Sequence, residues 1–243
     1  MYHHRYHRYF YTEYRRLYLQ SQVLVMDLLP QQDILVHIPE CLPPLPTYRL
    51  LLRPLAASDA EDLFAIRSRF EVAMSNYPKT PHQSVQETRE WMETKTFTEG
   101  PKSIIGRHFT YVVIENGASD NNTQRATVDS KVIGYISINQ VYPSPEIGYS
   151  IHPDYWGKGY ATEALDGLLK MWWDMPRQQR QDPAEAGEQI DKVDEEAEKV
   201  FAICEKANLR SGRVLTKCGF QLFKEIVYEE DQLYLWKLEK PAG

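Results

Sequence analysis

The stretch that most constrains the fold of this chain runs from Glu146 to Trp173. Its first part, residues 147–151, alternates large and small side chains and predicts a β-strand. Pro153 ends this strand, because proline lacks the N–H that a sheet needs and restricts the residue before it. Gly157 and Gly159 then lead into a helix with an apolar face. The sequence therefore predicts a strand, a glycine-containing turn and a helix in direct succession.

This turn is suited to bind a phosphate or pyrophosphate group. The N–H groups of a first helical turn have no partner within the helix, and the helix dipole adds partial positive charge. Lys158 offers a further charge. A dinucleotide-binding fingerprint would need glycine or alanine at position 162, where the chain has Thr162, and no P-loop motif occurs. The alternative interpretation is a tight turn without a ligand.

Two motifs resemble those of the GNAT acetyltransferase superfamily. Residues 155–165, YWGKGYATEAL, are similar to its acetyl-CoA site, although Trp156 stands where the signature [Q/R]-x-x-G-x-[G/A] has Gln or Arg. This variant looks like the Rim-type branch, which contains ribosomal-protein N-terminal acetyltransferases. Residues 208–220, NLRSGRVLTKCGF, match the family pattern N-x-x-S-x-x-[VL]-[LY]-x-K-x-G-F nearly completely. Two motifs in this order are more specific than either alone, and the resemblance covers about residues 48–238.

The resemblance implies an α+β (mixed α/β) fold. Its central, mostly antiparallel twisted sheet would have about six to seven strands, splayed at the cofactor site and flanked by about four helices. The pattern predicts the first two helices at residues 59–70 and 84–97. Each begins with a capping box, Ser58 with Glu61 and Ser84 with Glu87.

The predicted domain division places an N-terminal extension and linker at residues 1–46, partly disordered and closed by several prolines. Residues 47–243 would form the acetyltransferase domain. Within it, residues 174–198 carry many acids and predict a charged insertion, a solvated loop or short exposed helix. The alternative is that this insertion guides a basic acceptor to the site.

By resemblance, the co-substrate is acetyl-CoA, and its acetyl group passes to a primary amine by direct attack. The residues that would hold it pair with the pantetheine arm, cradle the pyrophosphate or, in the case of Asn208, contact the pantetheine or acceptor region: Ile147, Gly148, Tyr149, Ser150, Ile151, Trp156, Gly157, Lys158, Gly159, Tyr160, Ala161 and Asn208. For Asn208, a helix N-cap is an equally natural role.

Two residues are catalytic candidates by the same resemblance. Glu146 is the candidate base, with an exposed strand carboxylate as the equal alternative. The tyrosine that protonates the thiolate in many family members is replaced by Leu215, and Ser211 matches the serine that serves instead in the Rim-type branch. A helix-surface serine is the alternative interpretation.

The predicted activity is acetyl-CoA-dependent N-acetylation of a protein or peptide N-terminus, or of a small-molecule amine. A weakly equipped base suits an α-amine, with a pKa near ~8, better than a lysine near ~10.4. The alternatives are a polyamine- or antibiotic-type acetyltransferase and a catalytically idle acyl-CoA-binding or scaffold protein.

Composition bounds the remaining expectations. A net charge of −6 disfavours nucleic acid as a partner, and no apolar run approaches the ~20 residues of a membrane span. His82, His108 and His152 are isolated and lack metal-ligand spacing, and His3, His4 and His7 are more simply solvated terminal residues than ligands, so no metal is expected. Three dispersed cysteines fit the cytoplasm, while the arginine-rich first twenty residues leave mitochondrial targeting as an alternative. By resemblance, the chain would be a monomer or homodimer.

Overall fold

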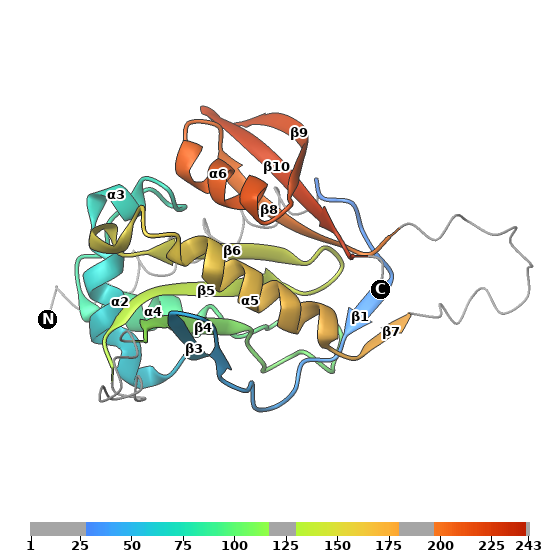
Figure 1. Cartoon of the computed structure of the whole chain (residues 1–243), viewed down its shortest axis with the longest axis horizontal. Coiled ribbons are helices and arrows are strands. Elements are labelled where there is room, and N and C mark those ends of the chain that lie inside the picture. The colour runs from blue at the N-terminus through green and yellow to red at the C-terminus, as the bar shows by residue number, and fades with distance from the viewer. Residues whose placement is uncertain (1–27, 117–129, 180–196, 242–243) are drawn as a thin grey trace, which may run out of the picture.

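A computed structural model describes residues 28–116, 130–179 and 197–241. Its centre is a sheet of eight strands in the order β2-β3-β4-β5-β6-β8-β10-β9 (Figure 1). Every neighbouring pair is antiparallel except β6 and β8, which are parallel. The strands are β2 (Leu45–Pro46), β3 (Leu50–Pro54), β4 (Thr110–Glu115), β5 (Val132–Gln140), β6 (Glu146–Ile151), β8 (Lys199–Glu205), β9 (Gln221–Tyr228) and β10 (Asp231–Glu239).

This architecture confirms the predicted mixed α/β fold and its mostly antiparallel sheet. The sheet has one strand more than expected, because the short β2 pairs with β3 at its edge. The helices among the described residues are α2 (Ala60–Arg67), α3 (Phe70–Ala73), α4 (Val85–Glu93), α5 (Tyr160–Asp174) and α6 (Leu209–Lys217).

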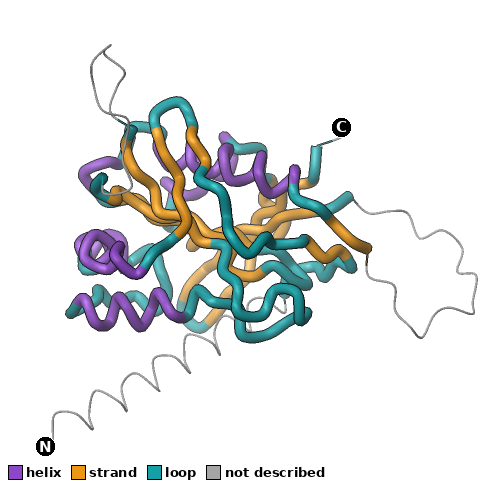
Figure 2. Tube along the Cα trace, turned by 90° about the horizontal axis from the view of Figure 1, so that it is seen from below, coloured by secondary structure: helices purple, strands orange, loops and turns teal. Residues whose placement is uncertain are grey.

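Helices cover both faces of the sheet (Figure 2). Tyr111 and Val113 of β4 pack in the larger core with α5, whereas Val112 and Ile114 pack with α2 and α4. This alternation follows from the two-residue period of a strand, which sends successive side chains to opposite faces. The apolar face predicted for the helix after Gly159 is confirmed, since all four of its residues are buried: Leu165, Leu168, Leu169 and Trp172.

Part of the segment that precedes the predicted domain packs against the sheet. Residues of β1 (Ile34–Val36) pair with β7 (Arg177–Gln179) in a separate two-stranded sheet. Val36 and Ile38 are buried in the larger core. Residues 1–27, which make up most of the predicted extension, lie outside the described residues.

Both described ends of the predicted charged insertion also pack on the domain, which differs from a solvated loop. The guanidinium of Arg177 donates hydrogen bonds of 2.7 and 2.6 Å to the carboxylate of Glu198. It also donates to the carbonyl of Trp172, near the end of α5. Residues 180–196 of the insertion lie outside the described residues, as do residues 117–129 between β4 and β5.

The starts of the first helices correct the sequence prediction. Ser58 lies within a 3-10 turn and caps nothing, whereas the carboxylate of Asp59 accepts from the N–H of Ala56 and from Arg53. Ser84 does cap α4, since its hydroxyl accepts from the N–H of Glu87. Phe70 was expected at the end of the first helix, predicted at residues 59–70, but that helix ends at Arg67, and Phe70 begins α3 and is 64% exposed.

The Arg53–Asp59 pair gives a test of stability. Two hydrogen bonds of 2.8 and 2.6 Å join these buried side chains. We expect Asp59→Ala to lower the free energy of unfolding by about 3–5 kcal/mol, because it leaves the guanidinium buried without its carboxylate. Urea denaturation measures the loss, and Glu71→Ala, which breaks a pair with exposed Arg69, is the control that changes stability little. Equal losses in both variants would contradict the expectation.

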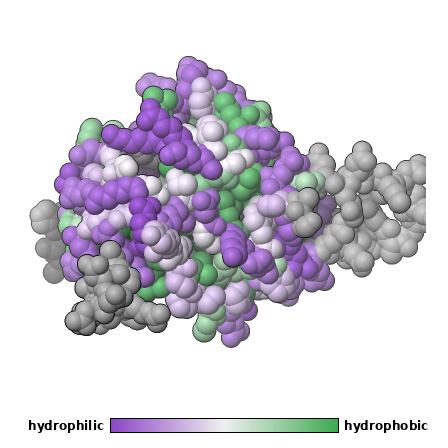
Figure 3. All heavy atoms as spheres, viewed as in Figure 1, coloured by the Kyte–Doolittle hydropathy of each residue, from purple (hydrophilic) through white to green (hydrophobic). Residues whose placement is uncertain are grey.

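The face of the molecule seen in Figure 3 is mostly hydrophilic, with a band of apolar residues that crosses the C-terminal strands towards α5. Within the part of the chain that the structure describes, no helix is long and apolar enough to cross a membrane.

Candidate active site

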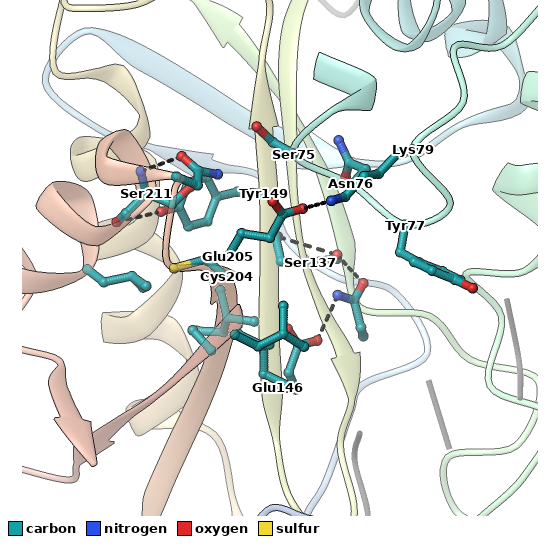
Figure 4. Close-up of a pocket in the computed structure, with 18 of the residues that line it drawn as sticks. Ser75, Asn76, Tyr77, Lys79, Ser137, Glu146, Tyr149, Cys204, Glu205 and Ser211 are labelled. Atoms are coloured by element: carbon teal, nitrogen blue, oxygen red, sulfur yellow. Dashed lines mark hydrogen bonds and ion pairs between the residues drawn. The ribbon is translucent and has the colours of Figure 1, made fainter. Parts of the chain in front are cut away.

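The two parallel strands separate soon after they meet. β6 and β8 pair only at Glu146 with Phe201 and at Ile147 with Ala202, whereas β6 stays paired with β5 as far as Ile151. From Gly148 onwards, the other edge of β6 therefore faces no strand among the described residues. A cavity of about 200 Å³ opens at this separation (Figure 4). Its walls come from β5, β6, β8, α6 and the segment between α3 and α4.

The turn that follows β6 has the backbone that a phosphate cradle needs. Gly157 and Gly159 have φ angles of 76° and 83°, a left-handed conformation that glycine adopts without steric cost. Gly159 is the N-cap of α5, so the free N–H groups of that helix begin at this turn. The guanidinium of Arg49 braces the turn, because it donates to the carbonyl of Lys158 (2.9 Å) and to the carboxylate of Glu163 (2.7 Å).

Trp156, at the position where the signature usually has Gln or Arg, links three parts of the site. Its indole N–H donates to the carbonyl of Ile151 at the end of β6 (2.6 Å). The guanidinium of Arg210 in α6 lies 4.2 Å from the centre of its ring. Lys158 lies over the ring of Tyr155 at 4.7 Å, so a cation is present beside the turn. The turn, β6 and α6 are thus joined by aromatic contacts.

Glu146 is not the exposed strand carboxylate that the sequence left as an alternative. Its side chain is buried, with 5% of the residue exposed, and its Oε2 accepts a 2.8 Å hydrogen bond from the amide of Asn139. Oε1 has no hydrogen-bond partner among the described residues, and Glu146 lines the cavity. Burial raises the pKa of Glu146 to about 7, against the opposing effects of Asn139 and Lys95. The carboxylate can therefore exchange a proton near neutral pH.

Asn139 is held by three neighbours. Its side-chain oxygen accepts from the ammonium of Lys95 (2.9 Å) and from the hydroxyl of Ser137 (2.7 Å), which turns the NH₂ group towards Glu146. Gly148, which pairs with Ser137 across the β5–β6 ladder, leaves the space for the Asn139 side chain, because an added Cβ would lie 2.4 Å from the Asn139 nitrogen. The side chain of Asn139 on β5 thus requires glycine at position 148 of β6.

The predicted residues of α6 lie on the opposite wall. Asn208 is the N-cap, and its side-chain oxygen accepts from the N–H of Ser211 (3.1 Å). Ser211 and Asn208 both line the cavity. The phenol of Tyr149 crosses from β6 and donates to the carbonyl of Ser211 (3.4 Å), and Leu215 is buried below. The structure thus brings Glu146, Tyr149, Asn208 and Ser211 to one cavity, while residues 157–161 lie at the start of α5.

Comparison with known proteins agrees with this geometry. The family described as "Acetyltransferase (GNAT) domain" matches residues 49–221. The chain belongs to the GNAT acetyltransferase family. No curated protein matches it in sequence.

Solved structures with the GNAT fold superpose over most of the chain. A GNAT-family acetyltransferase from Bacillus anthracis is 20% identical, with a TM-score of 0.57, over 81% of this chain and 98% of that one. The ribosomal L7/L12 alpha-N-protein acetyltransferase RimL, solved with coenzyme A, is 14% identical, with the same score and coverage. The microcin C7 self-immunity acetyltransferase MccE, solved with acetyl-CoA and AMP, is 14% identical, with a TM-score of 0.55, over 79% and 93%. At these identities, the likeness shows the fold.

Sequence reasoning missed the polar side chains that surround Glu146 in the GNAT domain: Lys95, Ser137 and Asn139. Ser137 and Asn139 are two residues apart on β5, so their side chains lie on the same face of the sheet. Two polar residues at this spacing within a predicted strand were the signal in the sequence. Nothing in the sequence around Lys95 pointed to the site, because it follows α4 and meets β5 only in the folded chain.

The cavity becomes more exposed towards a second polar group. Lys79 lies 2.8 Å from Glu205 and 2.7 Å from Asp231, and the side chains of these residues are 33%, 23% and 34% exposed. The ammonium thus bridges the α3–α4 segment to β8 and β10, across the cavity from α6 (Figure 4). Within the described ranges, no group of three or more His, Cys, Asp or Glu residues could hold a metal ion.

Proposed function

We propose that this GNAT domain is an acetyl-CoA-dependent N-acetyltransferase that acetylates a primary amine by direct attack. The observation that carries the proposal is the carboxylate of Glu146, which is buried, opens into the cavity and lies beside the free edge of β6. An ionised carboxylate is costly to bury, so such a group in a cleft is a candidate for proton transfer.

The free edge of β6 supports the proposed mode of binding. The pantetheine arm carries amide groups, which can pair with the backbone of residues 148–151 as an added strand would. The N–H groups at the start of α5, behind Gly157 and Gly159, would then hold the pyrophosphate. Trp156, Lys158, Tyr160 and Ala161 would support this turn.

The proposed reaction needs two proton transfers. Glu146 would take a proton from the acceptor ammonium, directly or through water, so that the neutral amine attacks the thioester carbonyl. The C–S bond then breaks, and the coenzyme A thiolate needs a proton. We assign this step to the hydroxyl of Ser211, which lines the cavity and has no hydrogen-bond partner among the described residues.

The acceptor we propose is the α-amine of a protein or peptide, with a small-molecule amine as the alternative. An α-amine has a pKa near ~8, so a carboxylate with a pKa of about 7 removes its proton with little cost. A scaffold without activity would not need Glu146 held open to the cavity.

The test is acetyl-CoA turnover by the purified chain, followed as free thiol. The acceptors are peptides with a free α-amine, the same peptides with a blocked N-terminus, and small amines. We expect thiol release with free α-amines only. Ser211→Ala should release thiol at about one tenth of the wild-type rate or more slowly. Protection of the protein against heat by acetyl-CoA, without thiol release from any acceptor, would instead favour an acyl-CoA-binding protein.

A further inference from the structure

We propose that Lys95 and Asn139 are positioning residues that hold Glu146 as an ionised carboxylate with one oxygen open to the cavity. The inference rests on the proposed function, in which Glu146 is the base. Its basis is a continuous chain of hydrogen bonds from the Lys95 ammonium to the side-chain oxygen of Asn139, and from the Asn139 amide to Glu146.

The amide of Asn139 has only one orientation that satisfies its neighbours. In its ammonium form Lys95 donates and cannot accept, so it must contact the oxygen of Asn139 rather than its nitrogen. Ser137 donates to the same oxygen, which leaves the NH₂ group for Glu146. An NH₂ donor favours the ionised carboxylate over the protonated one. Because Lys95 sets the orientation of Asn139, it favours the ionised form of Glu146 through the Asn139 amide.

The position of Lys95 shows that this cation is built into the site. The residue is only 9% exposed, and its ammonium lies 4.9 Å from the centre of the Trp91 ring. A lysine so buried needs compensation, which the aromatic face and Asn139 provide. Burial lowers the pKa of Lys95 to about 7, with Arg67 acting in the same direction and Glu146 opposing. Lys95 and Glu146 thus each favour the charged form of the other.

Other charged groups around the cavity are accounted for differently. The guanidinium of Arg67 donates to His82 and Tyr135, and Lys79 is paired with Glu205 and Asp231. The phenols of Tyr77 and Tyr149 and the thiol of Cys204 have pKa values raised by burial, so they stay neutral where Glu146 titrates. Tyr228 adds a further phenol to the lining. Lys95 is the cation linked to Glu146 by hydrogen bonds.

The test compares pH profiles of kcat/KM for wild type and Lys95→Met. The wild-type rate should fall below about pH 7, where Glu146 gains a proton. Loss of the cation should move this acidic limb to a pH about one unit higher. At pH values below the limb, kcat/KM of the variant should then be about tenfold lower than that of wild type, and at higher pH the two should be equal. KM for acetyl-CoA should be unchanged. Asn139→Asp, which has the same shape and adds a negative charge, should move the limb at least as far.

One control separates charge from structure. Lys206→Met removes a cation paired with Glu225 outside the cavity and should leave the limb in place. Superimposable limbs in wild type, Lys95→Met and Asn139→Asp would overturn the inference. So would a loss in Lys95→Met that is equal at every pH.

A direct titration keeps the inference independent of turnover. If the wild type releases no thiol from any acceptor, the proposed function fails. The ¹³C carboxyl signal of Glu146, assigned with Glu146→Gln, is then followed by NMR against pH. A higher pKa of Glu146 in Lys95→Met than in wild type supports the inference, and an unchanged pKa overturns it.

Discussion

Glu146→Gln is expected to lower kcat for amine acetylation by about 10²–10⁴-fold, the usual contribution of a positioned acid or base. Glutamine fills the same space and can still meet Asn139, but it cannot take the proton of the acceptor ammonium. The acidic limb near pH 7 should disappear with the carboxylate. Steady-state thiol release from pH 5.5 to 9 measures both effects.

The same substitution should not weaken the fold. The pKa of Glu146 is raised in the folded chain, so ionisation is disfavoured there, and the fold loses stability as the pH rises through the range from the unfolded to the folded pKa. Glutamine carries no charge, so the melting temperature at neutral pH should stay or rise. Glu225→Gln, on the exposed side of β9, is the matched control with unchanged activity. If the melting temperature fell together with the activity, the loss would be attributed to the fold, and the assignment of Glu146 as the base would be contradicted.

Local patterns in the sequence predicted most of the fold. The strand at residues 147–151, the helix with Leu165 and Trp172, and the N-cap at Asn208 depend on neighbours in the chain, so periodicity and turn residues indicate them. Phe70 was misplaced because its helix ends at Arg67, and a new one begins at Phe70 itself. Ser58 is not the helix N-cap that was expected, because Arg53 donates a hydrogen bond to Asp59, and this contact across the turn outweighs a local cap.

The candidate site divides in the same way. The turn at Gly157 and Gly159 is local in the chain, and its left-handed backbone is visible as a pair of glycines. The surroundings of Glu146 are not local, since Lys95 follows α4 and Asn139 belongs to β5, and only the packing of the sheet brings them together. Burial of Glu146, which raises its pKa, therefore had no signal in the sequence around it.

Gly159→Val should weaken binding of acetyl-CoA by about tenfold or more. A β-branched residue at a φ of 83° is strained by about 1–3 kcal/mol, so the turn would rearrange and its N–H groups would no longer converge at the start of α5. Only the contribution of the phosphate groups to acetyl-CoA binding should be lost. S-acetylpantetheine, which lacks the pyrophosphate, should turn over as well in the variant as in wild type.

Gly106→Val provides the matched control, because Gly106 has a φ of 80° and no atom within 4 Å of an added Cβ. It lies before β4, away from the turn, and should cost similar stability while leaving KM for acetyl-CoA unchanged. KM for acetyl-CoA and for S-acetylpantetheine, measured in both variants, separates strain in the fold from loss of the phosphate site. If Gly159→Val retained the wild-type KM for acetyl-CoA, or lost both substrates equally, the pyrophosphate would have to bind elsewhere, and the assignment of residues 157–161 would fall.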